Sequence, residues 1–187
     1  MTRNSTLRGL GSILARLAGD RKGVAALEFA LILPIMLMLL FGGVEVTQAI
    51  SCKRMVSLTA STVANIVTQY PTISQSEQMP DILNASTAVL TPYPVANAVV
   101  TVSLIAIDNG GNATVAWSQS KNGTARAAGS SVTLPAALDT PNTNLILGET
   151  SYAYNAAFDY LHLGTFNLYS SVYMFPRSLS GTVTLGP

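Results

Sequence analysis

The chain has 187 residues, of which 49% are hydrophobic and only 10% are charged. Residues 1–22 hold five of its ten basic groups and one of its nine acids, which leaves residues 23–187 with a net charge of −3. This mildly acidic remainder gives no support for nucleic-acid binding, which needs clustered Lys and Arg. The single cysteine, Cys52, excludes an intrachain disulfide and a multi-cysteine metal site, and we expect no cofactor.

A basic leader and a long apolar run open the chain. From Val24 to Val44 the sequence has 21 residues and only one charged side chain, Glu28. Because about 20 apolar residues span a bilayer as a helix, we expect one transmembrane helix over residues 24–46. The positive charge of residues 1–23 predicts that this leader stays in the cytoplasm, so that the rest of the chain is exported. The run is too long for the apolar core of an ordinary secretory signal, which has about 7 to 15 residues.

Glu28 is the exception within the apolar run. A carboxylate about one helical turn inside the membrane costs a few kcal/mol unless it is neutralised or paired. We therefore expect Glu28 to have a partner.

The apolar pattern continues beyond the expected membrane span, with a helical period. Residues 47–70 carry one apolar stripe whose members are three or four residues apart, which is typical of an amphipathic helix. Its members are Ala49, Cys52, Val56, Ala60, Val63, Val67 and Tyr70. Pro71 should end the helix. We expect the stripe to pack on a globular domain, with Cys52 a small buried residue; an intersubunit disulfide is the alternative role for Cys52.

Residues 71–187 should form the exported domain, of class α+β. A short helix and several strands are expected there, because β-branched runs alternate with turn residues. In chain order we expect a helix over 79–90, a hairpin over 98–107 and 113–117, a loop over 119–144, and strands over 145–158, 171–175 and 182–185. Pro176 should mark a sheet edge. The prediction is a long N-terminal helix packed on an antiparallel sheet of about four strands.

Residues for catalysis are sparse. His162 is the only histidine, so a metal site is not expected. A Ser-His-Asp triad would need His162 with Asp159 or Asp139, but no GxSxG motif accompanies them. We therefore expect no enzymatic activity.

The residues around Glu28 carry a resemblance to known proteins. The segment Gly23-Val24-Ala25-Ala26-Leu27-Glu28-Phe29 resembles a type IV prepilin processing site. The resemblance implies that a prepilin peptidase cuts after Gly23, so that Val24 becomes the new N-terminus and Glu28 the fifth residue. The wider pattern resembles the TadE/TadG-like family, the pilin-like minor pilins or pseudopilins of tight-adherence (Flp) pilus systems. Its residues are Arg21, Gly23, Ala26, Glu28, Phe29, Ala30, Leu31, Pro34, Gly42 and Glu45.

This resemblance implies a non-enzymatic minor pilin-like subunit of the bacterial inner membrane, whose C-terminal domain is periplasmic or lies in an extracellular pilus. The implied partners are the prepilin peptidase, other pilus subunits, inner-membrane assembly proteins and the lipid bilayer. Glu28 would pair with the N-terminal ammonium of a neighbouring subunit. The alternatives are an uncleaved TadG-like membrane anchor and a membrane-tethered periplasmic enzyme.

Overall fold

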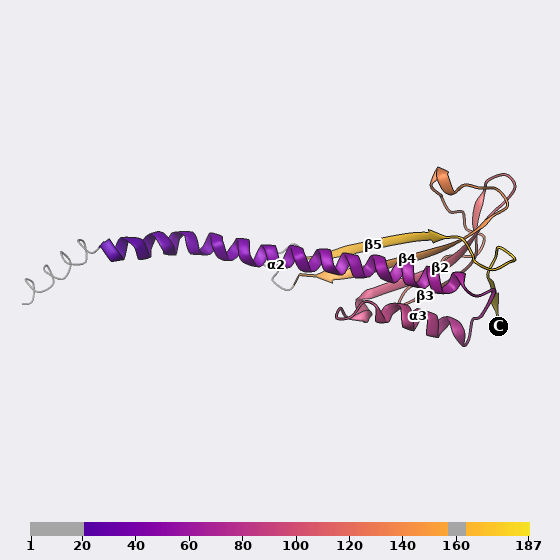
Figure 1. Cartoon of the computed structure of the whole chain (residues 1–187), viewed down its shortest axis with the longest axis horizontal. Coiled ribbons are helices and arrows are strands. Elements are labelled where there is room, and N and C mark those ends of the chain that lie inside the picture. Colours follow the sequence, from indigo (N-terminus) through magenta and orange to yellow (C-terminus); the bar gives the residue numbers. More distant parts are fainter. Residues whose placement is uncertain (1–20, 157–163) are drawn as a thin grey trace, which may run out of the picture. The chain divides into compact units, whose positions relative to one another are not determined.

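A computed structural model describes residues 21–156 and 164–187 of the chain (Figure 1). Internal contacts divide the chain into two units, Met1–Val46 and Thr47–Pro187. Helix α2 (Arg21–Thr68) contributes residues to both units.

Helix α2 has 48 residues and continues through Pro34. It ends at Thr68, two residues before the predicted end. Pro71 disfavours the helical conformation for Tyr70, whose amide instead donates to the carbonyl three residues back, on Val67. Tyr70 is 40% exposed, so its assignment to the buried stripe is wrong.

The first unit is described only by the apolar part of α2. All its side chains from Gly23 to Leu40 are exposed. In the part of the chain that the structure describes, one helix is long and apolar enough to cross a membrane, with a mean hydropathy of 2.5 over its most apolar stretch. This feature indicates a single-pass membrane protein.

The second unit contains a four-stranded antiparallel sheet with the order β3-β2-β4-β5. The strands are β2 (Ala98–Ile107), β3 (Ala113–Lys121), β4 (Asn144–Asn155) and β5 (Thr165–Met174). The predicted hairpin is therefore confirmed, and the Asp108 carboxylate closes its turn by accepting the amides of Gly110 and Asn112. The predicted short helix is α3 (Gln78–Ala88).

Three strand predictions need correction. β3 extends to Lys121 into the predicted loop, because hydroxyl pairs between β2 and β3 support this polar stretch. β5 begins at Thr165 rather than at residue 171. The last strand, β6 (Thr184–Gly186), pairs in parallel with β1 (Thr72–Ser74), which the sequence did not predict, and these two form a separate sheet.

The half of α2 that belongs to the second unit packs its apolar stripe on one face of the four-stranded sheet. Cys52 and Val56, near the start of this half, share a buried cluster with Tyr152 and Tyr154 of β4. Each fully buried Val-sized side chain stabilises the fold by about 1.5 to 3 kcal/mol. This cluster therefore ties α2 to the C-terminal part of β4.

The later part of the stripe lies over the opposite end of β4. Val63 and Val67 share a second cluster with Val100 and Val102 of β2 and with Ile146 of β4. Helix α2 therefore runs antiparallel to β4 along the sheet. The predicted stripe is confirmed from Cys52 to Val67, where every predicted member has 0% exposure.

The closest approach between helix and sheet is at Gly148 of β4. A Cβ atom there would lie 2.4 Å from the backbone oxygen of Ala60 and 3.0 Å from the Cβ of Ala64. Only glycine allows the helix backbone to lie this near the strand. The α+β class, with a long N-terminal helix packed on a small antiparallel sheet, is confirmed.

Candidate functional site

The sequence-predicted site residues lie in the first turns of α2. Gly23 is the third residue of the described helix, Val24 follows it, and Glu28 lies about one turn beyond Val24. Val24 is 56% exposed and Glu28 is exposed. Among the described residues, none forms a hydrogen bond or an ion pair with the Glu28 carboxylate.

Val24 and Glu28 occupy the same face of α2 because they are four residues apart. They are separated by about 6 Å along the helix axis. Helical side chains tilt toward the N-terminus, so the Glu28 side chain leans back over the turn that contains Val24. An ammonium on Val24 would thus lie on the face that carries the Glu28 carboxylate.

Gly23 is not required by the packing of the chain itself. A Cβ at this position would meet nothing within 4 Å. Glycine destabilises a helix by about 1 kcal/mol relative to alanine, so α2 is locally weakened at the bond between Gly23 and Val24. Packing among the described residues gives no reason for glycine at this position.

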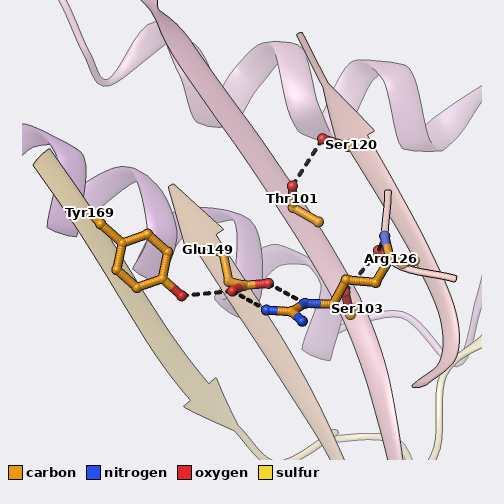
Figure 2. Close-up of polar contacts among 7 residues, drawn as sticks. Thr101, Ser103, Ser120, Arg126, Glu149 and Tyr169 are labelled. Carbon is orange, nitrogen blue, oxygen red and sulfur yellow. Dashed lines mark hydrogen bonds and ion pairs between the residues drawn. The ribbon is translucent and has the colours of Figure 1, made fainter. Parts of the chain in front are cut away.

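Sequence reasoning missed a polar cluster on the other face of the sheet, away from α2 (Figure 2). The carboxylate of Glu149 accepts hydrogen bonds from Arg126 Nε at 2.8 Å and from Arg126 Nη2 at 2.6 Å. The hydroxyl of Tyr169 donates to the same carboxylate at 2.7 Å. Glu149 belongs to β4 and Tyr169 to β5, whereas Arg126 lies in the segment after β3, so the ion pair holds this segment on the sheet.

Glu149 is 8% exposed, and its surroundings stabilise the charged form. Burial alone would raise the pKa of Glu149, but hydrogen bonds from Arg126 and Tyr169 hold this pKa below its usual value. The segment carrying Arg126 continues to Val132, Leu134 and Leu138, which cover an apolar cluster on this face. A sequence signal existed: Glu149 shares the alternation of the buried residues 145 and 147, and a buried acid needs a partner.

Other reactive groups form no centre in the described part of the chain. No group of three or more His, Cys, Asp or Glu side chains there could hold a metal ion. His162 and Asp159, considered for a triad, lie outside the described residues. The Cys52 thiol is free and has 0% exposure, and burial raises its pKa, so the prediction of a small buried residue is confirmed.

Replacing Glu149 with Gln should lower stability in a pH-dependent way. At neutral pH we expect a loss of about 1 to 2 kcal/mol, less than for a fully buried pair, because the Arg126 side chain is 40% exposed. Since the pKa of Glu149 is lowered on folding, the wild type loses this advantage as pH falls below the usual carboxyl value through the lowered one. Thermal melts of both proteins, followed by circular dichroism, should therefore converge in acid.

Glu77→Gln is the matched control, because Glu77 is exposed. It should leave the melting temperature unchanged at both neutral and acidic pH. A difference between wild type and Glu149→Gln that stays constant with pH would contradict the role assigned to the charged pair.

The chain was compared with known protein families, curated proteins and solved structures. Residues 23–65 match the family model described as TadE-like protein. None of the curated proteins or solved structures matches the chain. The match begins at Gly23 and extends into the part of α2 that packs on the sheet. The predicted resemblance to the TadE/TadG-like family is therefore confirmed over residues 23–65.

Proposed function

We propose that this chain is a minor pilin or pseudopilin-like subunit of a tight-adherence (Flp-type) pilus system, processed by a prepilin peptidase after Gly23. The observation that carries this proposal is the coincidence of three features at one point of the chain. The family match begins at Gly23, Gly23 has open space around it in the first turn of α2, and the lone charge of the apolar run follows at Glu28. Residues 1–23 act as a cytoplasmic leader, and residues 24–46 span the inner membrane.

Cleavage would change the electrostatic surroundings of Glu28. It would create an ammonium on Val24 and bring Glu28 close to a free helix N-terminus, where the helix dipole favours negative charge. In lipid, both charged groups are costly unless they are paired. The ammonium of one subunit pairs with Glu28 of the next, so assembly relieves the cost that an isolated subunit carries in the membrane.

The exported domain, residues 71–187, needs no catalytic centre for this role. The second half of α2 is part of the core of this domain. Force on the helix is therefore transmitted to the domain through packed side chains. This arrangement suits a structural subunit whose partners are other pilus subunits and inner-membrane assembly proteins. An uncleaved membrane anchor with the same domain is the alternative that processing experiments distinguish.

Replacing Gly23 with Val should block processing without disturbing the fold. The added side chain meets nothing within the chain, so a defect would reflect the peptidase, which must bind an extended backbone at the membrane surface. In cells that contain the peptidase, the variant should keep residues 1–23 and migrate as the larger species, while mass spectrometry of the wild type should find Val24 at the N-terminus. Gly42→Val is the matched control, since a Cβ at Gly42 also meets nothing within 4 Å, and it should be processed normally. Retention of Met1 in the wild type would instead support the uncleaved anchor.

Replacing Glu28 with Gln should spare cleavage and weaken assembly. The side chain keeps its size but loses the charge that pairs with the neighbouring ammonium, so crosslinking to other pilus subunits in the membrane should fall about tenfold, the equivalent of one lost charge-assisted contact. Glu45→Gln is the control on the same helix, because Glu45 lies about 25 Å further along the axis, away from the new N-terminus. Equal crosslinking by wild type and Glu28→Gln would refute the pairing role.

A further inference from the structure

Strand β5 is an unprotected edge of the four-stranded sheet. It has ten residues without a charge, proline or glycine. Its pairing with β4 is regular, from Asn155 opposite Thr165 to Ile146 opposite Met174. Natural proteins normally shorten, bend, charge or cover a strand of this kind, because its free backbone groups pair with other chains.

The opposite edge of the same sheet is protected. β3 has an irregular register beside Leu104 and Ile105 of β2. The segment after β3 then folds back along its outer edge, where the amide of Val115 donates to Ser130 and the amide of Val132 donates to Ala113. Within the described residues, the chain thus covers the start of β3 and adds no strand to the outer side of β5.

A lysine of α2 reaches the backbone of β5. The ammonium of Lys53, on α2, donates to the backbone oxygen of Tyr169. Lys53 is exposed, so its flexible side chain can leave this oxygen without disturbing the core. Phe166 and Tyr169 are 43% and 50% exposed, so apolar surface accompanies the free backbone groups.

We propose that β5 receives an extended segment of a different polypeptide, which adds to the sheet as a fifth strand. The side chains of β5 define the chemistry of this segment. On the face toward α2, β5 places Leu168 and Met174 against the two core clusters, whereas Asn167 and Ser171 point to the other face. Because side chains directly opposite each other interact across strands, the partner segment is uncharged, with apolar residues alternating with hydroxyl or amide residues.

A second copy of this chain does not fit the edge. Head-to-tail pairing of β5 with β3 is obstructed at the start of β3, where Ala113 and Val115 already form backbone hydrogen bonds with residues 129–132. A twofold-symmetric pairing of β5 with β5 is antiparallel. Leu168 lies beside the start of the α2 stripe and Met174 beside its end, so β5 and this part of α2 run in the same direction. Twofold pairing would oppose the two α2 segments, which is incompatible with copies whose helices enter one membrane in the same sense.

The test uses the full chain in detergent micelles and a labelled synthetic peptide with the sequence of residues 165–174. This peptide has the required alternation and no attached helix to restrict its direction. We expect saturable binding in fluorescence anisotropy. Two further peptides carry N-methyl groups on alternate residues, one on the even-numbered and one on the odd-numbered positions. In an added edge strand, only every second amide donates to the neighbouring strand. The peptide that is N-methylated at these donating positions should lose affinity about tenfold or more, because several hydrogen bonds are lost. The other N-methylated peptide should bind as well as the unmodified one.

Variants of the chain complete the experiment. Asn167→Lys, which introduces a charge on the exposed edge, should abolish binding, whereas Ser131→Lys, at an exposed serine beside the covered edge, should not. No saturable binding, equal effects of both N-methylated peptides, or unchanged binding to Asn167→Lys would overturn the proposal. Disulfide-linked dimers of Asn167→Cys would overturn the choice of partner in favour of a second copy, because the native Cys52 is buried.

Discussion

The close approach of α2 to the sheet at Gly148 is the constraint on which the second unit depends. A Cβ atom at Gly148 would lie 2.4 Å from the Ala60 oxygen, so the helix and the strand are in direct backbone contact. A helix that moved away from the strand would open the core. Small residues of the stripe on one side and a glycine on the other let the two backbones meet. Two apolar clusters then form along the line of contact, one at each end of β4. The loss of this contact would expose the stripe and the sheet face together.

The two halves of α2 have different surroundings. From Gly23 to Leu40 its side chains are exposed all round, and they are apolar apart from Glu28, as lipid requires. From Thr47 one apolar stripe faces protein, while Ile50 and Leu58 stay exposed and serines and threonines occupy much of the remaining surface. Under the proposed function, Glu28 is a charged group in the lipid half whose side chain has no partner among the described residues, and pairing it makes association favourable. The open edge of β5 offers the exported half a second means of association, by backbone hydrogen bonds.

The sequence predicted those parts of the fold that rest on local periodicity, and it failed where partners are distant in the chain. The stripe from Cys52 to Val67 repeats at helical spacing, so one window of sequence reveals it. β1 has only three residues, and its pairing with β6 depends on a chain segment more than a hundred residues away. The Arg126–Glu149 pair is also invisible to periodicity, because a segment without regular structure brings Arg126 to the strand. By contrast, Glu28 could be singled out from the sequence because a charge in an apolar run is a local feature, whereas Gly23 was identified through the resemblance of residues 23–29 to a prepilin processing site.

The central claim is that the second half of α2 belongs to the core of the exported domain. Thermal unfolding of two fragments, residues 48–187 and 72–187, tests it most directly. The longer fragment retains the stripe and should be soluble and unfold cooperatively. The shorter one loses several buried Val-sized contacts, each contributing about 1.5 to 3 kcal/mol, which exceeds much of the stability of a typical domain. It should therefore aggregate or show no thermal transition; equal melting temperatures for the two fragments would contradict the account.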